Sequence, residues 1–343
     1  MSGILLKNVS VSYSGRKVLR DLNLSFPESG LSLVIGPNGA GKTTLLKVIA
    51  GLVSYEGNVY IGGKIVDKVP PNRRKISYVP QNSSLIPNLR VWENIALGLF
   101  DRGYSFEQIG ERVETYAKLL NVDKLLNKYP ATLSGGEARR VSIARALAFD
   151  SDVILMDEPE ISIDSHAWRF ILDAIFKIAE DDKRSLILIT HNFEDLIPFA
   201  RNLCVLFDGK VVFSGDPSQI NTENLPIEIK TWLGTVIEVD EVVNNGHFCE
   251  AFLDSHRIYA GRIKRGRKIK RVLVLPKFIS IDSNKGLKGK VVNVFNHADI
   301  ATVFIDVGGQ EIVFSSRDRF QKGEEITINI EKVIPLCDDY ESL

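Results

Sequence analysis

Long hydrophobic runs, a net charge and a cysteine framework are all missing from this chain of 343 residues. Lys plus Arg and Asp plus Glu both number 43, so no whole-chain field favours nucleic acid or an anionic membrane as a partner. No apolar run approaches the roughly 20 residues that span a bilayer. The sequence after Met1 is strand-like and is not a charged and then apolar leader. We therefore expect a chain that neither crosses a membrane nor is exported.

Cysteines are few, and their arrangement excludes most structural roles for them. Cys204, Cys249 and Cys337 are far apart and odd in number. This favours reduced thiols in a cytosol over a disulfide framework or a zinc site. The remaining composition is that of an ordinary globular protein, and the length is sufficient for two domains.

The first part of the chain, up to about residue 225, alternates strand-like runs with helical patterns. The clearest strands are 31–35, 153–156 and 186–190, and the clearest helices are 42–50 and 136–149. Such alternation predicts an α/β layer with a mostly parallel sheet. Residues 94–128 interrupt it with helical spacing and no strand, which predicts an inserted helical subdomain.

Beyond about residue 234 the pattern changes to short alternating segments separated by Gly, Asn and Asp. They are residues 289–294, 301–306, 311–314 and 325–330. This pattern predicts a small all-β barrel.

A glycine-rich segment follows the first buried strand and opens a helix, which is the setting that supports a P-loop. It consists of Gly36, Pro37, Asn38, Gly39, Ala40, Gly41, Lys42, Thr43 and Thr44. Its N–H groups and the helix N-terminus can hold phosphate, Lys42 can bridge the β- and γ-phosphates, and Thr43 can place its hydroxyl on Mg²⁺. The alternative, a turn that only caps a helix, explains the glycines but not Lys42 and Thr43.

Two acids and a histidine follow the next strands at their carboxyl ends, where open α/β sheets bind ligands. Asp157 and Glu158 come after residues 153–156, and His191 comes after residues 186–190. We predict that Asp157 holds Mg²⁺, that Glu158 polarises the attacking water, and that His191 donates a hydrogen bond to the γ-phosphate. The alternatives are an exposed acidic turn and a structural histidine.

A third element, Leu133 followed by Ser134, Gly135, Gly136 and Glu137, precedes another predicted helix. It places a hydroxyl and free N–H groups at a helix N-terminus, which is a second anion site. With this pentapeptide the chain resembles the ATP-binding cassette (ABC) family over about its first two thirds, with the motifs in the family's order.

The resemblance implies a dimer. Residues 36–44 match the family's Walker A loop, residues 134–137 its signature and residues 153–158 its Walker B strand. In the family the signature of one subunit closes on the ATP held by the Walker A loop of another. ATP is then the link of a two-fold homodimer, whose closing and opening follow binding and hydrolysis.

The resemblance also implies roles for single residues. Gln81 matches the Q-loop glutamine, Asp164 the D-loop aspartate and His191 the switch histidine. Tyr13 matches the aromatic residue that stacks on adenine, with core packing of a strand tyrosine as the alternative. The implied Mg²⁺ ligands are Thr43, Gln81 and Asp157.

The chain departs from the family pattern after the Walker B strand and after the signature. The usual Ser-Ala-Leu-Asp is Ile161-Ser-Ile-Asp164 here, preceded by Glu160, and Ala138 stands where Gln or Arg is common. Neither departure removes a catalytic group. Glu160 is expected to alter contacts at the dimer interface.

Residues 70–81 and 89–99 resemble importer ATPases of the molybdate, sulfate, iron and maltose group. The resemblance implies that the surface near Gln81 and the helical subdomain receives a coupling helix of an integral-membrane permease. The alternative is a surface loop of no special use. Leu85, Ile86 and Trp92 are apolar for such a loop, which favours a docking groove.

The C-terminal part resembles the OB-like regulatory domain of the same importers, at residues 289–294 and 304–310. The family's Arg-Pro-Glu stretch is replaced by residues 275–278 here, so no function is carried over from it. A basic run at 257–271 favours solvated strand faces over an oxyanion or head-group site.

The expected fold class is α/β: a P-loop NTPase cassette with a mostly parallel sheet core and a helical subdomain, plus a C-terminal all-β OB-like barrel. The expected domains are a nucleotide-binding domain at 1–228 with its helical subdomain at about 82–148, a linker at 229–235 and a regulatory domain at 236–343.

The expected function is the ATP-binding and hydrolysing subunit of an ABC importer, with ATP and Mg²⁺ as cofactors. It would form a homodimer on the cytoplasmic face of the cell membrane, attached through a permease that an extracytoplasmic solute-binding protein supplies, with no nucleic acid as partner. The expected cargo is an oxyanion such as molybdate or tungstate. The alternatives are a sugar or iron importer ATPase and, less favoured, a soluble non-transport ABC ATPase.

Overall fold

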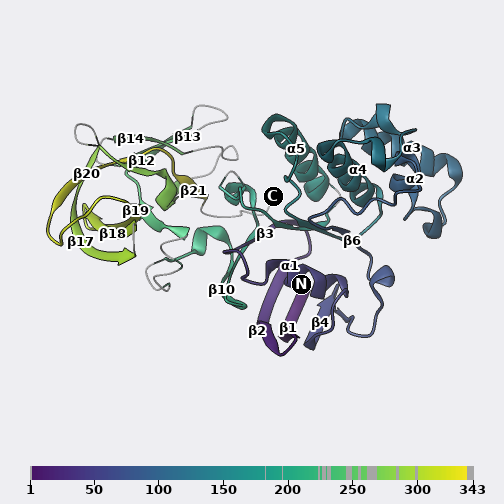
Figure 1. The fold of residues 1–343 in the computed structure, drawn as a ribbon, viewed down its shortest axis with the longest axis horizontal. Helices are drawn as coiled ribbons and strands as arrows, with labels where there is room; N and C mark the ends of the chain where they lie inside the picture. Colours follow the sequence, from purple (N-terminus) through teal and green to yellow (C-terminus); the bar gives the residue numbers. More distant parts are fainter. Residues whose placement is uncertain are drawn as a thin grey trace. The chain divides into compact units, whose positions relative to one another are not determined.

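The chain folds into two compact units (Figure 1). The computed structural model describes residues 2–181, 183–194, 196–222, 225, 229, 233–244, 249–253, 256–260, 269–282, 286–297 and 300–337. One unit consists of Met1–His191 and Arg201–Ser214, and the other of Asn192–Ala200 and Gly215–Leu343. The chain therefore first leaves the first unit directly after His191. The domain boundaries expected from the sequence stay a prediction.

The first unit contains an antiparallel and a mostly parallel sheet. The antiparallel sheet has the order β2-β1-β4-β5. Its strands are β1 (Ser2–Tyr13), β2 (Arg16–Pro27), β4 (Glu56–Ile61) and β5 (Lys64–Ile65). The other sheet has the order β10-β9-β3-β8-β7-β6. Its strands are β3 (Gly30–Ile35), β6 (Ile76–Val79), β7 (Val153–Asp157), β8 (Ser185–Ile189), β9 (Asn202–Phe207) and β10 (Lys210–Gly215).

Helices cover both faces of the mostly parallel sheet. Figure 1 shows α1 (Lys42–Ala50) between the two sheets, with α4 (Gly135–Ala148) and α5 (Ser165–Asp181) on the opposite side. The helical insertion also contains α2 (Val91–Ala96) and α3 (Phe106–Leu119). Short 3₁₀ helices are η1 (Pro71–Arg73), η2 (Phe100–Arg102), η3 (Asp123–Leu125) and η4 (Pro130–Thr132).

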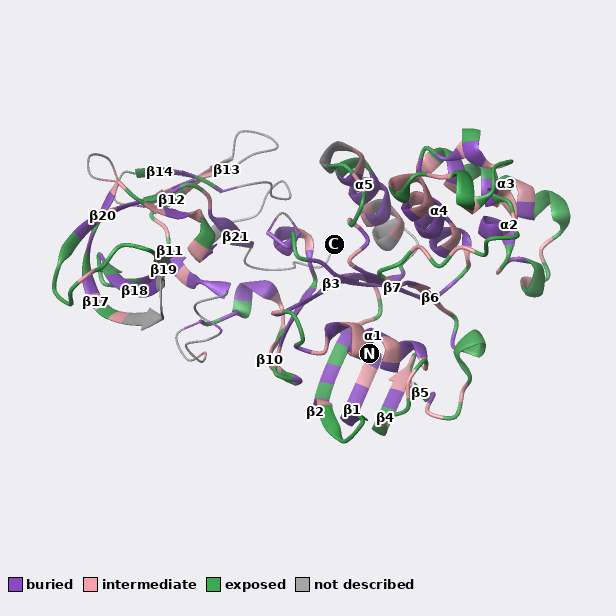
Figure 2. Cartoon of the chain, viewed as in Figure 1, coloured by how far each residue is buried: buried purple, intermediate pink, exposed green. Residues whose placement is uncertain are grey.

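The central strands are buried along their whole length, because a parallel sheet in an α/β layer is covered on both faces. Every residue of β3, β7 and β8 is buried, and β3 and β7 are purple in Figure 2. The core between the sheets packs Leu45, Leu46 and Ile49 of α1 against Val34 and Leu155. This core fixes the direction in which α1 leaves β3.

The predicted strands and helices of this unit are confirmed, with ends that differ by one residue at most. The strand predicted at 186–190 is β8, which ends at Ile189, so Thr190 already belongs to the loop that carries His191. The helix predicted at 136–149 is α4, which begins at Gly135. Residues 94–128 contain helices and no strand, as predicted, but the predicted start at residue 94 falls inside α2, which begins at Val91.

The second unit consists mainly of strands in three sheets. Their orders are β11-β15-β21, β12-β13-β14 and β16-β20-β17-β18-β19. The strands are β11 (Thr235–Glu238), β12 (Glu241–Asn244), β13 (Cys249–Leu253), β14 (His256–Tyr259), β15 (Ile269–Val274), β16 (Ile279–Ile281), β17 (Leu287–His297), β18 (Ile300–Val307), β19 (Gln310–Ser316), β20 (Glu325–Ile330) and β21 (Ile334–Cys337). Its 3₁₀ helices are η5 (Ile197–Phe199), η6 (Pro217–Gln219) and η7 (Pro276–Phe278).

One hydrophobic core joins these sheets. It includes Ile237 and Val274 of the first sheet, Ala251 of the second, and Val303 and Ile328 of the third. The four strands predicted from alternation correspond to β17, β18, β19 and β20, which confirms the predicted strand-rich C-terminal region. The basic run at 257–271 lies mostly outside the described residues.

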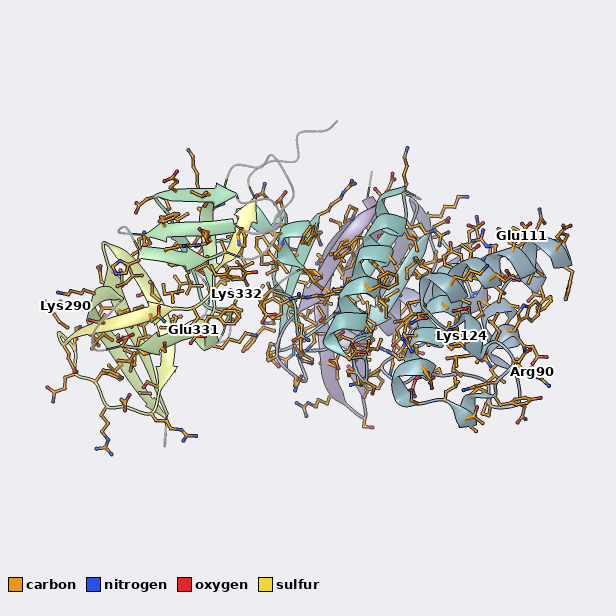
Figure 3. All side chains as sticks on the ribbon, turned by 90° about the horizontal axis from the view of Figure 1, so that it is seen from above. Arg90, Glu111, Lys124, Lys290, Glu331 and Lys332 are labelled. Carbon is orange, nitrogen blue, oxygen red and sulfur yellow. The ribbon has the colours of Figure 1, made fainter. Side chains whose placement is uncertain are left out.

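Charges of both signs are distributed over the surface of each unit. Figure 3 shows Arg90, Glu111 and Lys124 on the helical insertion, and Lys290, Glu331 and Lys332 on the second unit. In the part of the chain that the structure describes, no helix has the length and hydrophobicity that crossing a bilayer requires.

Candidate active site

The carboxyl ends of four adjacent parallel strands form the site. Strands β3, β8, β7 and β6 are neighbours in that order and pair in parallel. The segments that follow them carry, respectively, the glycine-rich loop, His191, Asp157 with Glu158, and Gln81. Polar groups far apart in the sequence therefore meet at one edge of the sheet, which is where open α/β sheets bind ligands.

The glycine-rich loop brings the N-terminus of α1 to this edge. Gly41 is the N-cap residue at φ 102, a left-handed conformation that a side chain disfavours, and no side chain caps the helix. The first N–H groups of α1 therefore have no side-chain acceptor, and its first turn carries no acid. This is an open anion-binding helix end.

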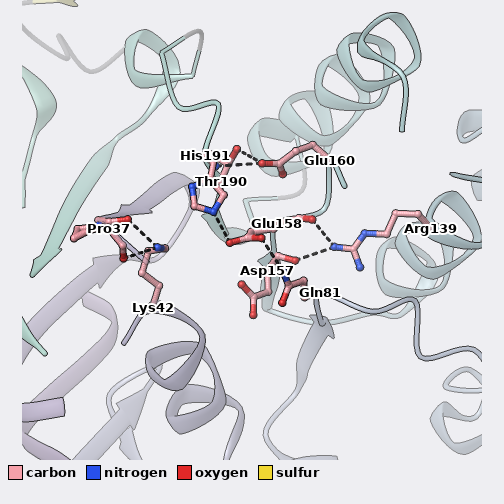
Figure 4. A network of polar contacts seen from close by, with 10 residues as sticks. Pro37, Lys42, Gln81, Arg139, Asp157, Glu158, Glu160, Thr190 and His191 are labelled. Carbon is pink, nitrogen blue, oxygen red and sulfur yellow. Dashed lines mark hydrogen bonds and ion pairs between the residues drawn. The ribbon is translucent and has the colours of Figure 1, made fainter. Parts of the chain in front are cut away.

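Lys42 lies inside this loop and is only 7 % exposed. Its Nζ donates to the carbonyl oxygens of Gly36 at 2.8 Å and Pro37 at 3.0 Å (Figure 4). Burial lowers the pKa of Lys42 below its ordinary value, while Glu158 and Asp157 oppose this shift. An anionic ligand would favour the charged ammonium further, because opposite charges stabilise each other.

Asp157 is buried at the end of β7. Burial raises the pKa of its carboxyl, whereas a hydrogen bond from Thr43 lowers it. The hydroxyl of Tyr78 lies 3.5 Å from its Oδ2, and its Oδ1 is buried without a hydrogen-bond partner. A buried carboxylate oxygen that lacks a partner, beside a threonine hydroxyl, is suited to a cation.

Glu158 is held by contacts on both of its carboxylate oxygens. His191 Nε2 lies 2.8 Å from Oε1, and Gln81 Nε2 donates to Oε2 at 3.0 Å (Figure 4). Glu158 has φ 47, so its backbone is in the left-handed region. Its side chain is 14 % exposed, whereas that of His191 is 48 % exposed. The structure thus brings together Gln81, Glu158 and His191, all three predicted from the sequence.

Arg139 belongs to the signature helix α4, and its side chain reaches this site. The sequence assigned no role to it. It is 1 % exposed, and its guanidinium donates to the carbonyls of Asp157 and Glu158 at 2.8 Å each and to that of Pro159 at 3.1 Å. It also donates to the carbonyl of Pro80, next to Gln81. Arg139 therefore connects α4 with the loops that carry Gln81 and Glu158. The sequence around Arg139 is polar and does not predict that this side chain is buried.

Glu160 and Thr190 are two further residues without a predicted catalytic role. Glu160 Oε1 accepts a hydrogen bond from Thr190 Oγ1 at 2.5 Å and from the backbone N–H of His191 at 3.2 Å (Figure 4). The sequence singled out Glu160 as a departure from the family pattern. It gave no indication of this contact, because the two segments are separate in the sequence.

The signature residues begin α4. Ser134 Oγ accepts from the N–H of Glu137 at 3.3 Å, and Glu137 Oε2 accepts from the N–H of Ser134 at 2.8 Å, which is a capping box. Gly135 and Gly136 form the first helical positions. Among the described residues, no hydrogen bond or ion pair joins this helix end to the glycine-rich loop. The structure does not bring the two predicted phosphate-binding elements into contact within the chain.

Tyr13 and Asp164 complete the predicted set. Tyr13 ends β1 and is 44 % exposed, so its ring is accessible. Asp164 is exposed, and its Oδ1 accepts from the N–H of Ala167 at 2.9 Å at the beginning of α5. The roles assigned to both residues stay predictions.

The described residues contain no cluster of three or more His, Cys, Asp or Glu side chains that could hold a metal ion. Mg²⁺ bound to a nucleotide requires only one or two protein oxygens, because phosphate oxygens and water complete its shell. The unpartnered Oδ1 of Asp157 and the Thr43 hydroxyl fit that requirement.

The segment after Gln81 is fastened to the helical insertion. Asn94, fully buried, donates from its amide to the carbonyls of Ile86 and Leu89 at 3.1 and 3.0 Å and accepts from the N–H of Ile86 at 2.8 Å. Arg145 donates to the carbonyl of Ser84 at 3.0 Å. The segment after Gln81 is therefore joined to both α2 and α4.

Apolar side chains are exposed on the same insertion. Trp92 contacts Phe106 and Phe100 with ring centroids 5.6 and 6.4 Å apart. Phe106 is 73 % exposed, Phe100 50 % and Ile86 38 %. Neighbouring aromatic side chains that are half or more exposed to water are typical of an interaction surface.

Known proteins resemble this chain over nearly its full length. The ABC transporter family profile matches residues 19–160. The glucose import ATP-binding protein GlcV of Saccharolobus solfataricus is 31 % identical over 97 % of this chain and 98 % of its own length. The molybdate/tungstate import ATP-binding protein WtpC of Pyrococcus horikoshii is 28 % identical over 89 % of this chain and 90 % of its own. The spermidine/putrescine import ATP-binding protein PotA of Thermotoga maritima is 31 % identical over 85 % of this chain and 81 % of its own.

Solved structures resemble the first part of the chain. An ATP-binding cassette solved as a dimer in a post-hydrolysis state with ADP and Pi has a TM-score of 0.58 and 30 % identity, covering 62 % of this chain and 98 % of that one. A second dimeric cassette gives the same TM-score of 0.58 at 31 % identity.

Proposed function

This chain belongs to the ABC transporter family as an importer ATP-binding subunit that hydrolyses ATP, and on that premise we propose which residues bind, cleave and transmit. One observation carries the proposal: Lys42, Asp157, Glu158, His191 and Gln81, contributed by four strand ends, converge on one edge of the sheet. Phosphoryl transfer depends on this kind of placement, because positioning and charge stabilisation supply most of its catalysis.

ATP binds at the N-terminus of α1. The phosphates take the open N–H groups of residues 36–44, and Lys42 exchanges its two carbonyl contacts for phosphate oxygens. Thr43 and Thr44 lie in the first turn of α1, and Tyr13 offers an exposed ring to the adenine.

Mg²⁺ would be held by Thr43, Asp157 and Gln81. When bound, it neutralises charge that develops on the phosphate oxygens. The buried Oδ1 of Asp157 supports this assignment, because ionising it without a partner is unfavourable and a cation removes that cost.

Glu158 positions and polarises the attacking water. Its two oxygens are occupied by His191 and Gln81. We propose that both partners turn toward the γ-phosphate when ATP arrives and leave a Glu158 oxygen free to accept a proton from water. His191 then donates to the γ-phosphate, where negative charge develops.

A second copy of the chain completes each site. The end of α4, with Ser134, Gly135, Gly136 and Glu137, has no bond to the glycine-rich loop of its own chain among the described residues, which supports closure onto the ATP of a partner subunit, with Asp164 at the same interface. The dimeric cassettes at 30 and 31 % identity support the same arrangement. Closing and opening of this homodimer would follow ATP binding and hydrolysis.

The permease docks on the apolar group formed by the exposed Ile86, Phe100 and Phe106 together with the half-buried Trp92. The ties from Asn94 and Arg145 to the segment after Gln81 give this surface a mechanical link to the ATP site. The subunit would thereby sit at the cytoplasmic face of the membrane without entering it.

We propose an oxyanion such as molybdate or tungstate as the cargo. The WtpC relatives, 28 % identical over 89 % of the chain, support this choice. The glucose, polyamine and Fe³⁺ import relatives supply the competing cargoes for the test.

Reconstitution with the permease in vesicles tests the function. ATP hydrolysis should rise when a solute-binding protein loaded with its cargo is added, and molybdate or tungstate should be the solute that accumulates. Hydrolysis that is indifferent to permease and substrate would contradict the importer. Accumulation of glucose, spermidine or Fe³⁺ instead would contradict only the oxyanion.

The Glu158→Gln variant tests the chemistry. We expect turnover to fall at least about 100-fold, because a general base contributes that much or more, while ATP-bound dimers accumulate in size-exclusion chromatography. Glu114→Gln, on an exposed face of α3, is the matched control. Continued turnover without a trapped dimer would refute the role of Glu158.

A further inference from the structure

Glu160 connects the two loops that carry the proposed water-activating and phosphate-contacting residues. It lies two positions after Glu158, and its Oε1 accepts from Thr190 Oγ1 at 2.5 Å and from the backbone N–H of His191 at 3.2 Å. Thr190 is 2 % exposed, so water does not readily substitute for this acceptor. One carboxylate thus binds both residues, Thr190 and His191, that directly follow β8.

The loop around Glu160 is itself restrained by the backbone. The N–H of Glu158 donates to the carbonyl of Ile189 at 2.9 Å, and the N–H of Ile163 donates to the carbonyl of Glu160 at 3.1 Å. Arg139 adds bonds to the carbonyls of Glu158 and Pro159. Glu160 therefore holds His191 from a loop that does not move independently of Glu158.

We propose that Glu160 is a positioning residue for ATP hydrolysis, which anchors the backbone of His191 while the imidazole exchanges Glu158 for the γ-phosphate. The inference rests on the roles proposed for Glu158 and His191. The imidazole is 48 % exposed and can turn, whereas the N–H of the same residue is bound. The anchor confines the exchange to side-chain rotation, so the imidazole starts within reach of both acceptors.

Glu160 does not fit a role as a second base. Its Oε1 already accepts two hydrogen bonds, and its Oε2 is buried without a partner, so neither oxygen faces water. Burial lowers the pKa of the Arg139 guanidinium, and Glu160 is the first among the acidic groups that oppose this shift, so the two side chains interact electrostatically. The geometry supports an acceptor that holds a loop.

The test is a kinetic cycle in the full-length protein with the variants Glu160→Ala, His191→Ala and the double variant. We expect Glu160→Ala to lower kcat about tenfold, equivalent to about 1.4 kcal/mol, with KM for ATP within about twofold of wild type. KM is expected to hold because, among the described residues, the Glu160 carboxylate bonds to Thr190 and His191 and not to residues 36–44. If Glu160 acts through His191, the double variant should be no slower than His191→Ala alone.

Conservative variants separate positioning from folding. Glu160→Gln keeps an oxygen acceptor for both donors and should retain kcat within about threefold. Thr190→Val removes one of the two donors at similar volume, and it should lower kcat less than Glu160→Ala does. It also provides the cycle with His191→Ala if Glu160→Ala fails to fold. Glu114→Ala is the surface control, and thermal unfolding of each variant reports its folded fraction.

Several outcomes overturn the inference. If the fold-losses of kcat in Glu160→Ala and His191→Ala multiply in the double variant, Glu160 does not act through His191. A raised KM at unchanged kcat would place Glu160 in ATP binding, and a Glu160→Gln variant as slow as Glu158→Gln would make it a base. If His191→Ala leaves kcat unchanged, the proposed role of His191 fails together with this inference. If His191→Ala is slow and Glu160→Ala is not, only this inference fails.

Discussion

The N-termini of α1 and α4 are built differently, although both are expected to hold phosphate. The end of α1 has Gly41 as N-cap, no side-chain cap and no acid in its first turn. The end of α4 has Ser134 and Glu137 in a reciprocal capping box. The N–H groups of a helix end serve either a cap or an anion. Helix α1 leaves them for a ligand, whereas α4 satisfies part of them internally.

The charges at the two ends reinforce this difference. Lys42 adds a cation to the positive end of the α1 dipole, so the helix end without an anion is unfavourable and an anion relieves it. At α4, Glu137 already supplies the negative charge that the dipole favours. We infer that α1 binds nucleotide in a single chain. The end of α4 becomes an anion site only when a second chain brings ATP to the remaining N–H groups of Gly135 and Gly136.

The largest expected effect breaks the α1 side of this comparison. Lys42→Ala removes the cation at the helix end, and we expect kcat/KM for ATP to fall about 1,000-fold, as for other preorganised groups that stabilise transition-state charge. Nucleotide titration and steady-state hydrolysis measure it. Lys47→Ala, in the last turn of the same helix, is the matched control and should stay near wild type. Equal losses of kcat/KM in Lys42→Ala and Lys47→Ala would mean that a positive charge has the same effect at either end of α1.

A smaller effect is expected where α4 packs most closely. A Cβ at Gly136 would lie 2.6 Å from the carbonyl oxygen of Ser162, whereas a Cβ at Gly135 would meet the Ser162 side chain no closer than 3.5 Å. We therefore expect Gly136→Ala to lower the free energy of unfolding by about 2 kcal/mol, because overpacking forces the backbone to shift. Gly135→Ala should change the same quantity by much less.

Urea unfolding of the two alanine variants measures this difference. Comparable losses for both would show that the Ser162 carbonyl does not limit the space at α4. The result also sharpens the comparison with α1. At Gly41 the backbone conformation requires glycine, whereas at Gly136 the neighbouring loop requires it.

The sequence predicted the α1 side of the site more fully than the α4 side. Lys42, Asp157, Glu158 and His191 could be predicted because each follows a buried strand, and parallel strands align their carboxyl ends at one edge. The same argument predicted the sheet and the helices that cover it. Gln81 was assigned by resemblance alone, and its bond to Glu158 places it at the same edge.

The contacts of Arg139, Tyr78 and Glu160 could not be predicted, because each joins segments that are separate in the sequence. The spacing of apolar residues along α4 does not indicate that Arg139 would be 1 % exposed. A buried arginine is recognised only by the carbonyls that accept its hydrogen bonds. In the second unit, alternation located β17, β18, β19 and β20, which contribute to a shared core. Alternation predicted no functional site in this unit, because it indicates only which residues face the core.

The smallest expected effect tests the capping box itself. Hydrogen bonds from the N–H and hydroxyl side of Ser134 lower the pKa of Glu137 below its ordinary value of 4.5. A carboxyl whose pKa is lower in the folded than in the unfolded state contributes stability that is present above pH 4.5 and is lost as the pH falls through the folded value. The stability difference between wild type and Glu137→Gln should therefore be constant between neutral pH and about pH 5 and shrink below it.

Denaturant unfolding of both proteins at a series of pH values measures this difference, with Glu114→Gln, an exposed acid of α3, as the control. A difference that persists unchanged at pH 3 would mean that the charge of Glu137 does not support the helix end. In that case the neutral hydrogen bond that Ser134 Oγ accepts from the backbone N–H of Glu137 would hold the helix end alone. The α4 terminus would then be electrostatically as open to phosphate as α1, and its weaker affinity in a single chain would have to come from the geometry of Gly135 and Gly136.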